Sequence, residues 1–284
     1  MNALYKALNT SRQAFHQRRQ RMLKMHKLKT QILPIIEQWR LDHPGMSIRL
    51  LYDQLRPSWI GRDRFEAFCF EEGFKVQQST NKFKTTRSAI HNPFPNLLQD
   101  RWLTGVNQVW VSDITYFQIP KQVTYITILL DLWSRFIVGH QVSVSLHTVH
   151  STLPALRKAL QSRKPARGLI LHSDGGGQYY SHQLLEVTKK HGVQNSMGRS
   201  VYENAQAERI HHTIKNQYLK HYHPGTLQEL KELTKAVIFR YNFERPHASL
   251  QKRTPAQYEK LQSLPSKKII HKTYATKTNI LILK

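Results

Sequence analysis

Acidic residues are scarce in this sequence. The chain of 284 residues has 18 Asp and Glu against 43 Lys and Arg, which gives a formal net charge of +25. Because 39% of the residues are hydrophobic and 10% are aromatic, the chain can build a folded core and is not a disordered basic tail. A folded protein with so large an excess of positive charge favours a polyanionic partner, and nucleic acid is the commonest one.

Cysteine and long apolar runs are also nearly absent. The single cysteine, Cys69, excludes an intramolecular disulfide framework and a cysteine-rich zinc site. No apolar run approaches the roughly 18 residues of a transmembrane helix, so we expect no membrane span. The basic start of the chain lacks the apolar centre of a secretory signal, and we therefore expect a soluble protein of a reducing compartment.

The texture of the sequence changes along the chain and predicts four regions. These are a helical DNA-binding region at 1–76, a basic linker at 77–104, an α/β region at 105–222, and a C-terminal helix with a basic tail at 223–284. The linker has cations that could follow a DNA backbone, namely Lys82, Lys84 and Arg87.

The first region has the apolar spacing of helices. Ser11 is placed to cap one helix, and a 3.6-residue apolar period runs on to a stop at His43-Pro44-Gly45. Two more helices are predicted at 48–55 and 62–72, and the second has arginines near its start, Arg62 and Arg64. Two helices joined by a tight turn are typical of a helix-turn-helix that reads the DNA major groove. The alternative is an ordinary helical domain with a basic, solvated face.

The α/β region begins with three short strands. They are predicted at 109–117, 125–130 and 136–144, close enough in sequence for an antiparallel meander. Helices and strands alternate after them, which predicts a mixed sheet flanked by helices. Thr226 and Glu229 have the spacing of a capping box that opens the last helix.

Three acids of the α/β region are placed for chemistry. Asp113 interrupts an apolar strand, Asp174 ends another and precedes three glycines, and Glu208 lies on a predicted helix. Two carboxylates about 4 Å apart repel by roughly 4 kcal/mol at an effective dielectric near 20, so a cluster of three needs a cation. Oxygen ligands suit Mg²⁺ or Mn²⁺. The alternative is solvated carboxylates at the loops of an ordinary α/β protein.

Five segments, taken in order, resemble a known family. They read WVSDITY at 110–116, LLDLWSRFIVG at 129–139, LHSDGGGQYY at 171–180, SMGRSVYENAQAE at 196–208 and RPHASLQKRTPA at 245–256. They resemble the retroviral-integrase-type core of bacterial insertion-sequence transposases, most closely the second-reading-frame product of two-frame elements. Residues 31–76 are similar to the helix-turn-helix of that family. The resemblance implies an RNase H-like core with Asp113, Asp174 and Glu208 as catalytic and metal-binding residues and with two Mg²⁺ or Mn²⁺ ions.

The activity implied by the resemblance is that of a metal-dependent DNA transposase. Such an enzyme cleaves phosphodiesters at the ends of its element and transfers the 3′ hydroxyl to target DNA. The implied partners are both DNAs, further copies of the chain on DNA and an upstream-reading-frame product, in a bacterial cytoplasm at the nucleoid. Two alternatives stay open. One is a catalytically inactive DNA-binding regulator derived from a transposase, and the other is a basic protein that coats nucleic acid without sequence preference.

The resemblance also bears on the helix of Glu208. Lys215 matches the basic residue that the family has seven positions after its glutamate, about two helical turns on, and is expected to contact end DNA. Only 33 residues separate Asp174 from Glu208, whereas the family usually has 35. Glu203 is the rival glutamate, but it lies about 140° around the helix from Glu208. Residues 204–208 align with the family's motif so that Glu208 falls on its glutamate, and this favours Glu208.

Other polar residues of this part of the chain are given structural interpretations. Asp131 is expected to support the sheet or to pair with Arg135. The histidines after Glu208 could suggest zinc, but without cysteines a solvated or DNA-facing helix is the preferred interpretation. These histidines are His211, His212, His221 and His223. The segment Arg245-Pro246-His247 is assigned to packing or to DNA backbone contact, and the sequence does not separate the two.

Overall fold

The structure is a computed structural model that describes residues 5, 10–76, 93–99, 101–198, 205–261, 268–272 and 280–283. It divides into two compact units, residues 1–44 and 45–284. Four residues of the sequence predictions lie outside the described residues: Lys82, Lys84, Arg87 and Glu203. No helix of the described part is both long enough and apolar enough to span a membrane.

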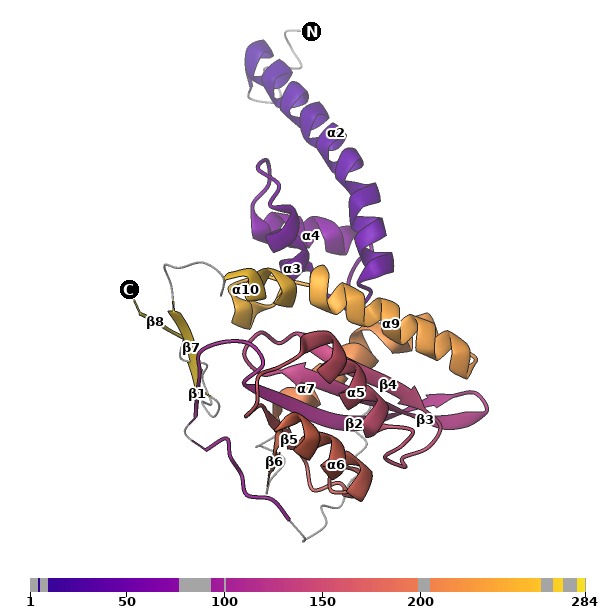
Figure 1. Cartoon of the computed structure of the whole chain (residues 1–284). Coiled ribbons are helices and arrows are strands. Elements are labelled where there is room, and N and C mark those ends of the chain that lie inside the picture. The colour runs from indigo at the N-terminus through magenta and orange to yellow at the C-terminus, as the bar shows by residue number, and fades with distance from the viewer. Residues whose placement is uncertain are drawn as a thin grey trace. The chain divides into compact units, whose positions relative to one another are not determined.

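The first unit contains one long helix, α2 (Arg12–Asp42), shown in indigo in Figure 1. Its N-cap is Ser11, whose hydroxyl accepts a hydrogen bond from the Ala14 N–H at 3.1 Å, as predicted. The helix ends at Asp42, directly before the predicted stop. From Arg12 to Lys29 it carries seven Lys or Arg and no acid, so this part of α2 is strongly cationic.

The second unit begins with the two predicted helices α3 (Ile48–Leu55) and α4 (Arg62–Glu71). Ser47 caps α3, and one face of α4 buries Phe65, Phe68 and Cys69. Both helices therefore form where the sequence places them. The rest of this unit is built on a central sheet.

The sheet has five strands in the order β4-β3-β2-β5-β6. The strands are β2 (Val109–Ile119), β3 (Gln122–Asp131), β4 (Ile137–Ser143), β5 (Ile170–Ser173) and β6 (Gln194–Met197). The first three form the predicted antiparallel meander, and β5 and β6 run parallel to β2. Counted along the chain, the order is 3-2-1-4-5, which is the arrangement of an RNase H-like fold and confirms that prediction.

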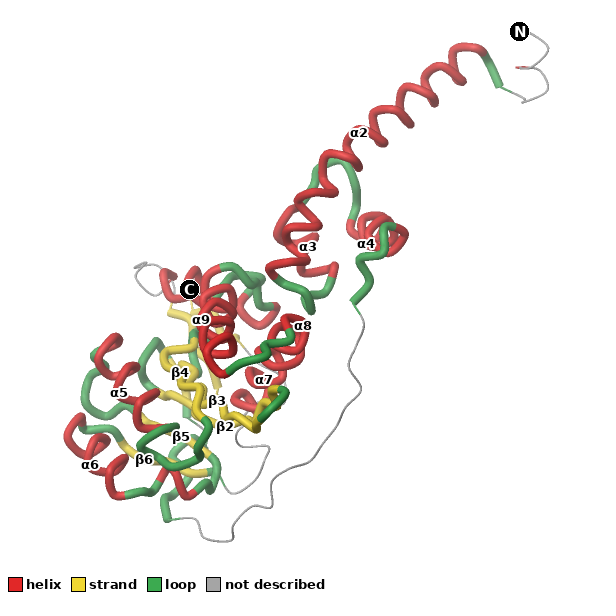
Figure 2. Tube along the Cα trace, turned by 90° about the vertical axis from the view of Figure 1, so that its right-hand side faces the viewer, coloured by secondary structure: helices red, strands yellow, loops and turns green. Residues whose placement is uncertain are grey.

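Helices cover both faces of the sheet, as Figure 2 shows. One face packs against α5 (Thr152–Arg163), beside which lies α6 (His182–His191); the other packs against α7 (Ala205–Ile214) and α9 (Leu227–Phe243). Because side chains alternate along β2, Trp110 packs in the core under α5 and α6, and Val111 packs in the core under α7 and α9. The mixed sheet flanked by helices is therefore confirmed.

Short elements complete the second unit. After α7 come a π-helical segment, η3 (Lys215–Leu219), and the short helix α8 (Lys220–Tyr222). The 3₁₀ turn η1 (Gly177–Tyr179) follows β5. The 3₁₀ turn η4 (Ala248–Leu250) and then the helix α10 (Pro255–Lys260) follow α9. A second sheet has the order β1-β7-β8, with β1 (Trp102–Leu103), β7 (Lys268–Lys272) and β8 (Ile280–Leu283).

The predicted capping box of α9 is only half formed. The Thr226 hydroxyl accepts from the Glu229 N–H, but the Glu229 carboxylate accepts from Gly225 instead of closing the box on Thr226. A complete capping box does occur at the start of α10, between Thr254 and Gln257. There Pro255 follows the cap at the first helical position, which suits a helix start.

Candidate active site

Asp113 on β2 and Asp174 at the end of β5 follow paired residues of two neighbouring parallel strands. The register of β2 and β5 pairs Ser112 with Ser173, and each aspartate is the next residue along the chain. Neighbouring strands lie about 4.8 Å apart. The fold therefore brings together two carboxylates that are 61 positions apart in the sequence.

Asp113 interrupts an apolar row on the face of β2 that meets α7. The alternate residues Val109, Val111 and Phe117 lie in the core on that side of the sheet. One carboxylate oxygen, Oδ1, accepts a hydrogen bond from the Ile114 N–H at 2.8 Å. Burial raises the pKa of Asp113 to about 6; the Ile114 N–H opposes this rise and the negative charge of Glu208 adds to it.

Asp174 lies directly after β5, where the glycine segment folds back onto it. The Gly176 N–H donates to Asp174 Oδ1 at 3.2 Å, and a Cβ at Gly176 would come within 3.1 Å of the same oxygen. Burial raises the pKa of Asp174 to about 6, and repulsion from Asp113 is the next largest cause. The negative charge of Asp113 thus disfavours the ionised form of Asp174.

Glu208 is exposed on α7 and acts on the pair from its rim. Its charge contributes to the raised pKa of Asp113, so Glu208 lies within electrostatic reach of Asp113, as Asp113 does of Asp174. Within the described ranges, however, no set of three His, Cys, Asp or Glu side chains is arranged to hold a metal ion. The three carboxylates are therefore not gathered into a ready three-ligand site in this structure.

His211 is buried beside Asp113, which corrects the interpretation of this histidine as solvated or DNA-facing. Its side chain follows Glu208 by one helical turn, and its Nε2 lies 3.9 Å from Asp113 Oδ2. Burial lowers the pKa of His211 to about 4, so the ring is neutral near pH 7. The reason is its place on α7: Ala207 and Ile214, four residues before and three after it, face the core, and His211 shares their side.

Lys215 is held against strand β2 at the start of the π-helical segment. Its ammonium group donates to the Tyr116 carbonyl at 2.8 Å and lies 3.8 Å from the centroid of the Tyr116 ring. The side chain therefore lies on the sheet-facing side of its helix. The predicted contact of Lys215 with end DNA stays a prediction.

Two further residues support the carboxylates and were missed from the sequence. The Tyr179 hydroxyl lies 2.9 Å from Ser112 Oγ, and both side chains are buried. Burial, followed by the charge of Asp174, raises the pKa of Tyr179 well above its usual value. The tie joins η1, which begins at the last of the three glycines, to the strand position that precedes Asp113. A tyrosine pair one residue after three glycines was the available sequence signal.

Asp131 and Arg245 are both buried and make hydrogen bonds within the protein. Asp131 is buried and accepts from backbone N–H groups of Asn107, Trp133 and Ser134, so it supports the turn after β3. Arg245 is 7% exposed and donates to the Gln217 side chain at 2.6 Å. Packing is therefore the role of Arg245 in this structure.

Arg62 and Arg64 are exposed at the start of α4, where they are accessible to DNA. The Arg62 guanidinium pairs with Asp63 at 2.9 Å. Over its length α4 carries two arginines and three acids, so the helix as a whole is not cationic.

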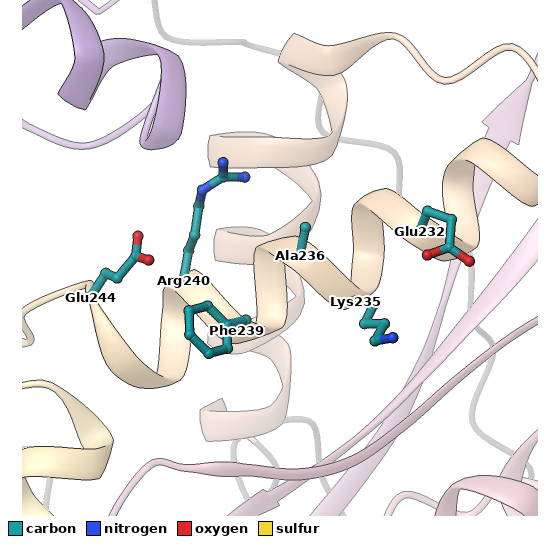
Figure 3. A pocket seen from close by; sticks show the side chains of 6 residues that line it. All are labelled: Glu232, Lys235, Ala236, Phe239, Arg240 and Glu244. Atoms are coloured by element: carbon teal, nitrogen blue, oxygen red, sulfur yellow. The ribbon is translucent and has the colours of Figure 1, made fainter.

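A hollow of about 370 Å³ on α9 lies apart from this chemistry (Figure 3). None of the three carboxylates lines it. Its lining residues are Glu232, Lys235, Ala236, Phe239, Arg240 and Glu244.

Comparisons with known proteins find similar sequences. Two family descriptions named Integrase core domain match residues 104–202 and 191–255. The insertion element IS600 uncharacterized 31 kDa protein of Shigella sonnei is 33% identical over 205 residues, covering 70% of this chain and 75% of that protein. Transposase InsF for insertion sequence IS3A of Escherichia coli is 34% identical over 172 residues, covering 58% of each chain.

Solved integrase cores are also similar. The magnesium complex of the HTLV-2 integrase catalytic core domain is 18% identical with a TM-score of 0.44, covering 55% of this chain and 97% of that one. The catalytic core domain of BIV integrase is 20% identical with a TM-score of 0.39, covering 55% and 96%. By its identity to the IS600 protein over three quarters of that protein's length and by its two Integrase core domain matches, the chain belongs to the bacterial insertion-sequence transposases with an integrase-type core, a family of metal-dependent enzymes that cut and join DNA.

Proposed function

We propose that this chain catalyses both steps of transposition through Asp113, Asp174 and Glu208. It would cleave the phosphodiester at the element end and join the freed 3′ hydroxyl to target DNA. The observation that carries the proposal is the pair Asp113 and Asp174, adjacent on parallel strands, each with a pKa raised to about 6. Both steps are the same phosphoryl transfer, so one site can serve both.

The donor chemistry of this pair fits a hard divalent cation. Oxygen donors suit Mg²⁺ or Mn²⁺, and we propose two ions held by Asp113 and Asp174, with Glu208 turning inward from the rim. When bound, such ions polarise the scissile phosphodiester and stabilise the charge that develops on the attacking and leaving oxygens. The chain's own part is to keep two aspartates in register, with Tyr179 and Ser112 tied together beneath them.

The proposed partners are element-end DNA and target DNA. Lys215, Arg62 and Arg64 would contact the DNA, together with the linker cations Lys82, Lys84 and Arg87. A homo-oligomer on DNA would hold two ends together, and an upstream-reading-frame product is a further candidate partner. These proposals place the protein at the bacterial nucleoid, in the cytoplasm. They rest on family membership and on the net charge of +25.

The decisive experiment compares Asp113→Asn, Asp174→Asn and Glu208→Gln in the full chain, on a labelled element-end duplex with Mg²⁺. DNA binding should persist in all three, while cleavage and joining fall below detection. Glu186→Gln is the matched control, because Glu186 is an exposed acid on α6 on the other face of the sheet. Cleavage retained by any of the three site variants contradicts the assignment of that residue.

One observation favours the alternative of a catalytically inactive DNA-binding regulator. Glu208 is exposed and does not complete a three-residue metal cluster with the aspartates in the described chain. The same assay decides. A regulator would bind element ends in preference to competitor DNA and leave every strand uncut in both Mg²⁺ and Mn²⁺, even as the unaltered chain.

A further inference from the structure

His211 is a buried polar side chain whose ring nitrogens make no hydrogen bond of good geometry in the described part of the chain. It is 5% exposed. A polar group buried in this way is unfavourable, and such a group in a folded protein calls for an explanation. His172 provides the contrast within the same core, because its Nδ1 lies 2.9 Å from Ser196 Oγ.

Asp113 presents two acceptors to His211: its backbone, which acts to raise the pKa of the histidine, and its carboxylate. The Nε2 atom of His211 lies 3.9 Å from Asp113 Oδ2. A hydrogen bond spans about 2.7–3.2 Å, so a small side-chain movement would form one. The other oxygen, Oδ1, already accepts from the Ile114 N–H. His211 therefore faces Oδ2, the oxygen of Asp113 that does not accept from the Ile114 N–H.

The ammonium group of Lys215, which lies near His211, already has an acceptor. Lys215, one turn further along the helix, donates to the Tyr116 carbonyl at 2.8 Å. The imidazole is thus the donor on α7 that is placed to reach Asp113. A neutral imidazole offers one N–H donor, which an ionised carboxylate accepts strongly.

We propose that His211 is a positioning residue, whose Nε2–H donates to Asp113 Oδ2 when a divalent cation is bound there. The inference rests on the proposed function, because it gives Asp113 a metal-binding role. A bond to Oδ2, added to the Ile114 N–H at Oδ1, fixes the rotation of the carboxylate from both oxygens. The aspartate is then oriented toward Asp174 before DNA arrives, as outer-shell hydrogen bonds orient metal ligands elsewhere.

The test measures binding of Mn²⁺ by the full chain without DNA, using the electron paramagnetic resonance signal of free Mn²⁺. His211→Leu fills the volume without a donor, and His211→Gln retains an N–H at similar reach. His212→Leu is the matched control, since His212 is the next residue and is exposed. We expect the dissociation constant to rise about tenfold or more in His211→Leu, the range typical of outer-shell substitutions. It should change less than about threefold in His211→Gln and in His212→Leu.

A purely structural role predicts a different pattern. Leu removes a buried polar group that has no hydrogen bond of good geometry, so the metal-free thermal midpoint of His211→Leu should stay level or rise even as Mn²⁺ affinity falls. Unchanged affinity in His211→Leu, or an equal loss in His211→Gln, overturns the proposal. Asp113→Asn separates the two levels of inference. If it too binds Mn²⁺ like the unaltered chain, the proposed metal site fails; if it alone loses affinity, only the role of His211 fails.

The unaltered chain offers a measurement that does not depend on how a variant folds. With ¹⁵N-labelled histidine, Mg²⁺ should shift one Nε2–H resonance and slow the exchange of that proton with water. The resonance is assigned by its loss in His211→Gln. An Nε2–H signal that neither shifts nor gains protection on saturation with Mg²⁺ overturns the proposal.

Discussion

The negative charge of Asp113 raises the free energy of the ionised form of Asp174 across the β2–β5 boundary. The aspartates follow a paired serine on each strand, and repulsion from Asp113 is the second cause, after burial, of the raised pKa of Asp174. The ionised pair is therefore a strained arrangement in the metal-free chain. Its consequences can be measured without DNA.

The first prediction concerns stability and pH. The pKa of Asp113 is raised from 3.8 to about 6 in the folded chain, so the folded state holds its proton more tightly than the unfolded state. The free energy of unfolding should fall as the pH rises from about 4 to about 6, and the loss persists above pH 6. Asp113→Asn removes this pKa shift, which costs the folded state at most about 3 kcal/mol.

Urea unfolding in EDTA should find this variant more stable than the unaltered chain at pH 7.5 and equal to it at pH 4. A difference of the same size at both pH values contradicts the prediction.

The second prediction concerns the metal. A cation that binds the ionised pair should stabilise the folded chain by about 3 kcal/mol at a concentration one hundred times its dissociation constant. The rise in thermal midpoint with Mg²⁺ should be large at pH 7.5 and small at pH 5, where protons compete for both carboxylates. Asp113→Asn combined with Asp174→Asn should abolish it. A Mg²⁺ effect that survives in this double variant would place the binding site elsewhere.

Much of the fold could be predicted from local sequence, because the deciding interactions are local. The Ser11 cap, the stop at His43-Pro44-Gly45 and the apolar runs of β2 and β3 placed their elements within a few residues. The site was harder. That Asp113 is unusual follows from its apolar strand, whereas its pairing with Asp174 depends on the register of two strands joined by a long connection.

His211 shows where pattern reasoning went wrong and what it overlooked. The cluster of histidines suggested a solvated helix, but Ala207, Ile210 and Ile214 define the buried side of α7, and His211 lies on it. The apolar spacing of these residues could have been read from the sequence.

The partner of Lys215 could not be predicted in this way. The Tyr116 carbonyl lies 99 positions away, and only the packing of α7 on the sheet brings the two together.

The third prediction concerns Lys215. If its ammonium group moves from the Tyr116 carbonyl to a DNA phosphate, Lys215→Met should lower by about one the slope of log affinity for end DNA against log salt concentration. Lys189→Met is the control, because it removes the same charge from an exposed position at the end of α6. Its slope should not change. Equal slopes in Lys215→Met and the unaltered chain would assign Lys215 to packing alone.

The fourth prediction compares the two arginines at the start of α4. Asp63 already neutralises Arg62, whereas no acid is paired with Arg64 among the described ion pairs. Arg64→Ala should therefore weaken binding of element ends more than Arg62→Ala, by about 1–3 kcal/mol if the side chain reads a base. Competition between labelled ends and random duplex measures it. A larger loss in Arg62→Ala would show that Asp63 releases its partner on DNA.

The fifth prediction separates affinity from sequence preference. The segment of α2 from Arg12 to Lys29 has seven cations and no acid, while α4 has more acids than bases. We expect α2 to bind phosphates without reading sequence. Replacing Arg18, Arg19 and Arg21 with Gln should weaken binding to element ends and to random duplex by the same factor, and should reduce the salt slope by up to about 0.9 for each phosphate that the variant no longer neutralises. Filter binding at several salt concentrations on both duplexes provides the comparison. A weakening confined to element ends would give α2 a part in sequence recognition, because backbone contacts alone cannot distinguish two duplexes of equal length.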